Sequence, residues 1–194
     1  MNDENPPVPP KQGTGWRWLA FAWGFAEATF FFIVPDVLTS RLVIHQPKHG
    51  FLACLWALGG ALLGGTLLFI VARIPSAVPA ILNAFDYLPG IGPRLVEAAG
   101  EDLQTLGAAA LFRGALAGIP YKLYVVQAVD QGMSLGVFLL ASAAARLMRF
   151  GLVTALVWFI SSYPLRRTSI PAKLTLHAAG WTVFYALYFW FMRG

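Results

Sequence analysis

Charged residues are scarce in this chain, and their scarcity excludes most soluble folds. Asp, Glu, Lys and Arg make up 12% of the 194 residues, about half of the fraction that soluble domains usually carry. Hydrophobic residues make up 58% of the chain. This composition indicates an integral membrane protein, and the short length favours a single membrane domain without a fused soluble module.

Cysteine and the usual catalytic motifs are also nearly absent. Cys54 is the only cysteine, so the chain has no intrachain disulfide. There is no phosphate-binding glycine loop, nucleophile elbow or Cys/His cluster, and we expect no enzyme, cofactor or metal. His45 and His49 lie four residues apart, but Pro47 lies between them and no third ligand is near. Residues 1–15 lack the basic region and cleavage site of a signal peptide, which predicts a retained, disordered segment.

What the chain has in abundance is apolar sequence, in five stretches. The second and the fourth are long enough to cross about 30 Å of hydrocarbon as helices. The last is rich in aromatic residues and close to the minimum length, and it predicts a C-terminal transmembrane helix. The five stretches are residues 16–34, 51–72, 108–130, 133–161 and 176–192.

Proline and glycine interrupt the first and the third of these stretches. Pro35 breaks the first one, and Gly114, Gly118 and Pro120 break the third. Because proline removes a helical donor and clashes with the preceding turn, each stretch predicts two short helices around a bend. The short halves of the third stretch cannot cross a bilayer, which favours re-entrant hairpins whose bends are covered by protein or water.

The positions of the basic residues favour the same arrangement. If residues 17–46 enter and leave the membrane on one side, most of the Lys and Arg outside the apolar stretches share that side. The opposite side then holds the 74–107 connection, which is acidic apart from Arg94. Such an asymmetry predicts that the basic side is cytoplasmic. The basic set is Lys11, Arg17, Lys48, Arg166, Arg167 and Lys173, and the acidic set is Asp86, Glu97, Glu101 and Asp102.

The two interrupted stretches are related by a weak internal symmetry. Aligning Pro35 with Pro120 places similar hydropathy patterns over one another, and each pattern is followed by a long apolar span. This is typical of transporters built from inverted repeats, whose sites lie at the repeat interface. The predicted fold is therefore all-α and membrane-integral, with two re-entrant helical hairpins each followed by a transmembrane helix, plus a C-terminal transmembrane helix. Its units within one membrane domain (16–194) are residues 16–73, an interfacial connection of two short helices at 74–107, residues 108–161, and residues 176–192.

Four charged residues lie inside the interrupted stretches. Glu27 and Asp36 belong to the first, and Arg113 and Lys122 to the third. A charge at bilayer depth costs about 2.5–3.5 kcal/mol even on insertion scales, so it persists where it pairs or lines a wet cavity. We therefore predict that the two stretches meet near the membrane midplane and form a polar site.

Each of these residues also has a purely structural interpretation. Asp36 follows the Pro35 bend and is able to cap the returning helix. Glu27 is able to form a static ion pair with Arg113. Arg113 and Lys122 are able to extend their charged groups to the interface instead of binding a phosphate.

Two further sets of residues belong to the predicted site and its supports. Arg146 and Arg149 lie three apart, on one helical face with Ser142, and either balance the acids or extend a path for an anionic headgroup. Gly60 and Gly64 allow another backbone to approach closely, which predicts a packing role.

Four segments resemble one protein family in their order and spacing. They are FAEATFFFIVPDVL, GGALLGGTLLFIVAR, FRGALAGIPYKLYVVQA and LASAAARLMRF, within residues 20–160. The chain resembles the DedA superfamily, also called VTT or SNARE-associated membrane proteins, and most of all its short YqaA-like branch. It departs from many relatives in having VPD in place of a Pro-Gly-Glu turn, and in a longer spacing from Arg113 to Lys122.

The resemblance implies a multi-pass protein of the bacterial inner membrane with two opposed re-entrant hairpins. It implies a lipid translocase or scramblase that moves phospholipid or polyprenyl phosphate between leaflets, with coupling to protons. In that case Glu27 and Asp36 exchange protons, and Arg113 and Lys122, with Arg146, bind the headgroup. The alternatives are a proton-coupled transporter of a small anion or other solute, and a non-transporting scaffold. We expect no nucleic-acid partner, and the sequence is compatible with a homo-oligomer.

Overall fold

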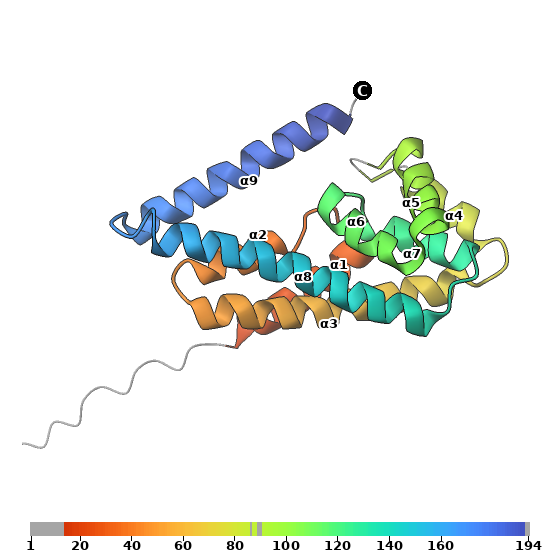
Figure 1. Ribbon diagram of the computed structural model, residues 1–194, viewed down its shortest axis with the longest axis horizontal. Helices are drawn as coiled ribbons and strands as arrows, with labels where there is room; N and C mark the ends of the chain where they lie inside the picture. Colours follow the sequence, from red (N-terminus) through yellow and green to blue (C-terminus); the bar gives the residue numbers. More distant parts are fainter. Residues whose placement is uncertain (1–13, 86, 89–90, 193–194) are drawn as a thin grey trace, which may run out of the picture.

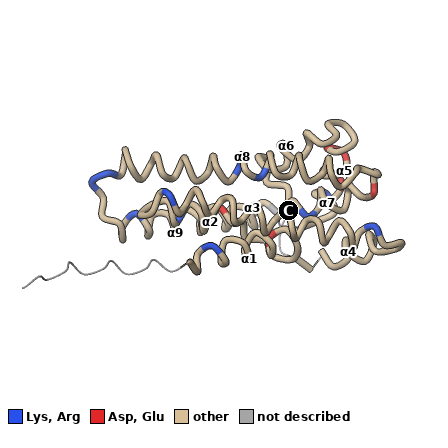
Figure 2. Tube along the Cα trace, turned by 90° about the horizontal axis from the view of Figure 1, so that it is seen from below, with Lys and Arg blue, Asp and Glu red and all other residues tan. Residues whose placement is uncertain are grey.

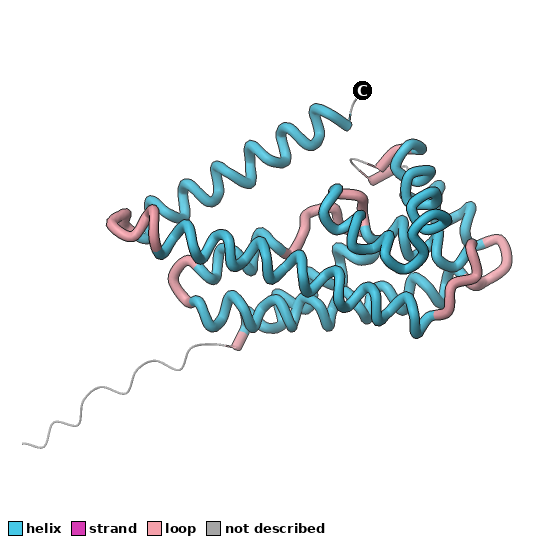
Figure 3. The backbone as a smooth tube through the Cα atoms, viewed as in Figure 1, coloured by secondary structure: helices cyan, strands magenta, loops and turns pink. Residues whose placement is uncertain are grey.

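The computed structural model describes residues 14–85, 87–88 and 91–192, and these form helices joined by loops (Figure 1). Within those ranges there is no strand, so the predicted all-α fold is confirmed (Figure 3). The predicted disordered segment, residues 1–15, lies outside the described residues except for its last two. Gly15 already begins the first helix.

The predicted break at Pro35 is confirmed. Helix α1 spans Gly15–Thr29, and helix α2, Asp36–Val43, begins directly after Pro35. Proline is tolerated at such a position because the first amides of a helix have no intrahelical acceptor. The connecting residues 30–35 form the tip of this first hairpin.

Both ends of the first hairpin lie at the start of the long helix α3, Pro47–Ala72. The Trp16 ring lies 4.8 Å from that of His49, and twelve residues further along α1, Ala28 lies against Gly64, so α1 runs parallel to α3. Val43 at the end of α2 contacts Gly50, which shows that α2 returns antiparallel to α3. The chain therefore enters and leaves on one side of this unit.

Helix α8, Leu135–Ser162, lies antiparallel to α3. Near one end Cys54 Sγ lies 3.3 Å from Thr154 Oγ1, and near the other the rings of Phe69 and Phe138 are 5.4 Å apart. Among the described residues, α3 and α8 are the helices that are long and apolar enough to cross a membrane. These are the two spans that the sequence predicts most clearly.

A second hairpin precedes α8 as the first precedes α3. It contains a 3-10 turn at Gly107–Ala109, helix α6 at Ala110–Ala117 and helix α7 at Tyr121–Asp130. The bend between α6 and α7 includes Gly118 at φ 79°, a left-handed conformation that glycine adopts without strain. Tyr121 stacks on Phe138 and its hydroxyl donates to Ser142 Oγ at 3.2 Å, so the start of α7 lies against the first half of α8.

The 74–107 connection contains the two short helices that its sequence predicts. Helix α4 spans Ala77–Phe85 and helix α5 spans Pro93–Leu106. The Gln131 side chain donates to the Gly100 carbonyl at 2.9 Å, which fastens α5 to α7. Helix α9, Ile170–Met192, is long, but it is not among the described helices whose length and mean hydropathy suffice to cross a membrane. Its tryptophan, tyrosine and histidine residues carry polar groups.

Charge is divided between the two ends of the molecule (Figure 2). Lys and Arg gather toward the end where α1 begins and α8 passes into α9, and the acids of α5 lie at the other end. Arg73, at the end of α3, and Arg94, in α5, also belong to that other end, so the two ends differ in charge only in part. The relation of the two ends to a membrane stays a prediction, and Lys11 and Asp86 lie outside the described residues. The basic residues at the first end include Arg17, Lys48, Arg166, Arg167 and Lys173.

Glycines allow α1 and α3 to pack with their backbones in contact. A methyl group at Gly60 would overlap the carbonyl oxygen of Phe21, and one at Gly24 would overlap that of Ala57. A methyl group at Gly64 would lie 2.8 Å from the Phe25 carbonyl oxygen. This close contact positions Glu27, which lies on the same helix, against the interior.

Buried charged side chains occur in this fold together with exposed apolar helix faces. Among the described residues, five charged side chains and a set of hydroxyl groups are buried, although Lys, Glu, Arg and Asp are seldom buried unless paired. The buried charged residues are Glu27, Asp36, Asp102, Lys122 and Arg146. Large apolar side chains are instead exposed along both long helices. They include Leu55, Leu63, Leu67 and Ile70 on α3, and Leu140, Leu147, Leu152 and Leu156 on α8.

Candidate functional site

The tips of the two hairpins meet beside the middle of α8, around a small cavity of about 80 Å³. We call this cavity the charge chamber. Its charged lining comes from both hairpins and from α8: Glu27 on α1, Lys122 on α7, and Arg146 and Arg149 on α8. Glu27, Lys122 and Arg146 are thus brought together, as the sequence predicts.

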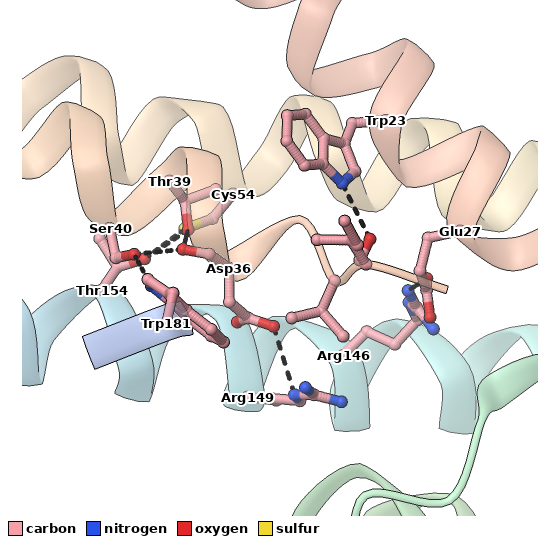
Figure 4. A network of polar contacts seen from close by, with 12 residues as sticks. Trp23, Glu27, Asp36, Thr39, Ser40, Cys54, Arg146, Arg149, Thr154 and Trp181 are labelled. Atoms are coloured by element: carbon pink, nitrogen blue, oxygen red, sulfur yellow. Dashed lines mark hydrogen bonds and ion pairs between the residues drawn. The ribbon is translucent and has the colours of Figure 1, made fainter. Parts of the chain in front are cut away.

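Glu27 and Arg146 form a buried ion pair (Figure 4). Each side chain is only 8% exposed, and Arg146 Nη2 donates to Glu27 Oε2. The guanidinium carbon of Arg146 also lies 4.2 Å from the centre of the Tyr121 ring, a cation–π contact. Because a buried charge is tolerated only with partners, this pair fixes α1 against α8.

Lys122 joins the second hairpin to the tip of the first. Its side chain is buried, and Nζ donates to the carbonyl oxygen of Phe31 at 2.7 Å. Phe31 lies in the interrupted segment between α1 and α2, where its carbonyl has no helical partner. The lysine therefore satisfies a backbone group that the helix break leaves open.

Two aromatic side chains satisfy further backbone groups of the same tip. Trp23 Nε1 donates to the Ile33 carbonyl at 2.9 Å (Figure 4), and the Val34 amide donates to the Tyr185 hydroxyl oxygen at 2.8 Å. Irregular backbone away from water needs such partners, because each unsatisfied group is costly. The tip is thus held by α1, α7 and α9 together.

Asp36 is fully buried at the first turn of α2, and its nearest basic partner is Arg149. Arg149 Nε lies 3.3 Å from Asp36 Oδ2. Neither carboxylate oxygen has a hydrogen-bond partner among the described residues. Asp36 does lie in the first turn of α2, where the helix-cap interpretation places it, but its carboxylate makes no hydrogen bond to a later amide of that helix.

Arg113 does not lie with the other charges, which corrects the expected Glu27–Arg113 pair. Its side chain is 62% exposed and Nη1 contacts Asp102 Oδ1 at 2.6 Å. The buried face of α6 is formed by Ala110, Leu111 and Gly114, so Arg113 lies on the other face, toward α5. Tyr124 also donates to Asp102 at 2.7 Å, and together they fasten the connection to the second hairpin.

A polar clasp that the sequence did not predict joins α9 to α2. Trp181 Nε1 donates to His177 Nε2 at 3.1 Å and to Ser40 Oγ at 3.3 Å, and Ser40 Oγ lies 2.8 Å from His177 Nε2. His177, Trp181 and Tyr185 are spaced by four residues and so share one helical face. This four-residue spacing of aromatic side chains with polar groups could have indicated that one face of α9 contacts the rest of the protein.

A larger groove of about 690 Å³ opens between α8, α9 and the end of α6. Its lining is mostly apolar, including Leu152, Val157 and Leu176, with His177 and Lys173 toward the start of α9. The groove and the charge chamber share lining residues, and Arg149 is the charged residue that both contain. A small charged cavity therefore adjoins a long apolar one.

Comparison of the chain with protein-family models, with curated proteins and with solved structures finds no match.

Proposed function

We propose that this chain is an integral membrane protein that moves phosphate-bearing lipid headgroups between leaflets, as a translocase or scramblase. The exposed apolar helix faces and the paired interior charges support a membrane environment, because exposed leucines are favourable in hydrocarbon and interior charges are tolerated when paired. Membership of the DedA superfamily is part of this proposal, and the order and spacing of the four sequence segments support it.

The lengths of the hairpin helices support the proposed re-entrant topology. Helix α6 has 8 residues and α7 has 10, so they are about 12 and 15 Å long, against about 30 Å of hydrocarbon. The first hairpin also returns to the end of α3 from which it started. With the basic end in the cytoplasm, the proposed location is a bacterial inner membrane.

The single observation that carries the proposal is the junction of the apolar groove with the charge chamber at Arg149. A lipid has the same two parts, a charged phosphate and apolar chains. In the proposed mechanism, the phosphate enters the chamber, where Lys122 and Arg146 are suited to anion recognition. The acyl or prenyl chains remain in the groove and the surrounding bilayer.

The acids have a different part in this mechanism. Glu27 and Asp36 balance the basic side chains when no phosphate is present, as the pairs Glu27–Arg146 and Asp36–Arg149 do. When a phosphate approaches, an acid that takes up a proton releases its base to the ligand. Proton uptake by Glu27 or Asp36 thus gives a route from a proton gradient to lipid movement.

Replacement of Lys122 tests the proposal. We expect the full-length protein in liposomes to exchange a fluorescent phospholipid between leaflets, and Lys122→Gln to slow this exchange by about tenfold or more, since a charge-assisted contact to phosphate is worth at least ~1.4 kcal/mol. The measurement is the rate at which dithionite, added outside, quenches the labelled lipid. Lys48→Gln, the same change at an exposed lysine of α3, is the matched control.

Three results would contradict the proposal. Uptake of inorganic phosphate without lipid exchange would indicate a carrier of small anions, and neither activity would indicate a static scaffold. An equal loss in the Lys122 and Lys48 variants would show that any lost lysine slows exchange. Size-exclusion profiles of both variants establish that each protein remains folded.

A further inference from the structure

Arg149 differs from the other two bases of the chamber in how it is held. Arg146 bonds Glu27 and stacks on Tyr121, and Lys122 bonds a backbone carbonyl. Arg149 approaches Asp36 through Nε at 3.3 Å, which is longer than an ordinary charge-assisted hydrogen bond. Figure 4 shows the remainder of its guanidinium group extending away from the carboxylate. The terminal nitrogens, which are the part of this side chain best shaped for binding a phosphate, therefore do not make its contact with Asp36.

Asp36, the partner of Arg149, is completely buried and yet makes few polar contacts through its carboxylate. Both of its carboxylate oxygens lack a hydrogen bond within the part of the chain that the structure describes. Buried polar groups are nearly always hydrogen-bonded, so an exception in a buried carboxylate calls for an explanation. One explanation is that the Asp36–Arg149 ion pair separates during function. A pair with a full set of hydrogen bonds would keep Arg149 from moving to a ligand.

The position of Arg149 also sets it apart. Its side chain is 23% exposed, against 8% for Arg146. It contributes to the lining of both cavities, while Asp36 contributes to neither. Arg149 is thus the charged side chain at the boundary between the groove and the chamber.

The charges around the chamber do not balance. Lys122, Arg146 and Arg149 are cationic, and Glu27 and Asp36 are the anionic side chains that pair with them. One positive charge is thus in excess among the described residues of this cluster. A ligand with a single net negative charge completes the balance, whereas a zwitterionic ligand leaves the excess charge in place.

We infer that Arg149 is an exchanging counter-ion that selects lipids whose phosphate headgroup carries a net negative charge. Without ligand it pairs with Asp36. With ligand its terminal nitrogens turn to the phosphate, and Asp36 remains buried behind it. This inference rests on the proposed function for the origin of its ligand, but it concerns binding and selectivity, which are measurable without transport.

Binding to the full-length protein in detergent tests the inference. The probes are short-chain phosphatidylglycerol, which is anionic, short-chain phosphatidylcholine, which is zwitterionic, and inorganic phosphate, each titrated by calorimetry. We expect the wild type to prefer phosphatidylglycerol by about tenfold, which corresponds to ~1.4 kcal/mol. Arg149→Gln should abolish this preference, and Asp36→Asn should maintain or increase it. Arg94→Gln, the same change at an exposed arginine of α5, should leave it unchanged.

Other outcomes would overturn the inference. If Arg149→Gln weakens both lipids equally, the arginine has only a structural role. If inorganic phosphate binds as tightly as phosphatidylglycerol, the ligand is a free anion and the groove does not contribute. The variant Asp36→Asn/Arg149→Gln removes both members of the pair, so that no buried charge is left alone; if it retains the preference, Arg149 does not determine selectivity. Failure of lipid exchange in liposomes, with selective binding intact, would contradict the proposed function and not this inference.

Discussion

Replacing Glu27 by glutamine is expected to lower the free energy of unfolding by about 3–5 kcal/mol, because it leaves the buried Arg146 without its counter-charge. The neutral amide still fits the space, so the loss comes from the missing charge and not from a cavity. The free energy is measured by equilibrium unfolding of the protein in detergent, from the far-ultraviolet circular dichroism of its helices. This is one of the two largest effects that we expect.

A double variant at Glu27 and Arg146 tests whether the unpaired charge causes the loss of stability. In Glu27→Gln/Arg146→Met no charge is left unpaired, and since apolar replacement of a whole buried pair is often neutral, most of the lost stability should return. Glu101→Gln, the same change at an exposed site on α5, should alter stability by less than about 0.5 kcal/mol. Additive losses in the double variant would show that Glu27 and Arg146 do not stabilise one another.

The second large effect is expected at the contact between α1 and α3. Gly60→Ala should destabilise the protein by about 3 kcal/mol or more, because its methyl group would overlap the backbone carbonyl of Phe21 and the two helices would have to separate. The separation would also displace Glu27 from Arg146, so lipid exchange should fall together with stability. Unfolding in detergent and exchange in liposomes measure the two effects.

The neighbouring glycine is a matched control. A methyl group at Gly59 would lie 3.7 Å from the Phe21 ring, an ordinary contact. Gly59→Ala should therefore leave stability unchanged or raise it by up to about 1 kcal/mol through better helix propensity. Equal behaviour of the Gly59 and Gly60 variants would mean that the two helices do not pack through their backbones.

The helical plan could be predicted from the sequence because its signals are local. Pro35, Gly118 and Pro120 mark the breaks directly, since proline lacks a donor and glycine alone adopts the left-handed bend without strain. Gly114 was also expected at a break, but it lies inside α6, where the Tyr124 ring packs against it. The two long apolar stretches likewise became α3 and α8. The relation of these helices to a membrane stays a prediction, because it depends on surroundings beyond the chain.

Which acid pairs with which base was harder to predict from the sequence than the helix breaks were. Arg113 was expected near Glu27, but the rotation of α6 about its axis directs it to Asp102 on α5. Arg146 pairs with Glu27 instead, which depends on how α1 packs against α8. Helix rotation is fixed by tertiary packing, and the weak amphipathicity of helices with apolar residues on every face gives few clues to it.

The role of α9 was also only partly visible in the sequence. Its length and apolarity predicted a C-terminal span, but Tyr185 bonds the tip of the first hairpin and Trp181 bonds Ser40. Aromatic residues with polar groups at the end of a chain are typical of interfacial belts. Their use as hydrogen-bond partners of broken backbone depends on the position of the hairpin tip.

The central claim is that each hairpin enters and leaves the membrane on a single side, the two hairpins from opposite sides, and the accessibility of introduced cysteines tests this for the first hairpin. In a Cys54→Ala background, Gly15→Cys, Lys48→Cys and Ile74→Cys are treated with a membrane-impermeant maleimide in intact cells and in inside-out vesicles. The account predicts that positions 15 and 48, at the two ends of the first hairpin, react only in vesicles and that position 74, beyond α3, reacts only in cells. Reaction of positions 15 and 48 from opposite sides would mean that residues 15–46 cross the membrane, and would contradict the account.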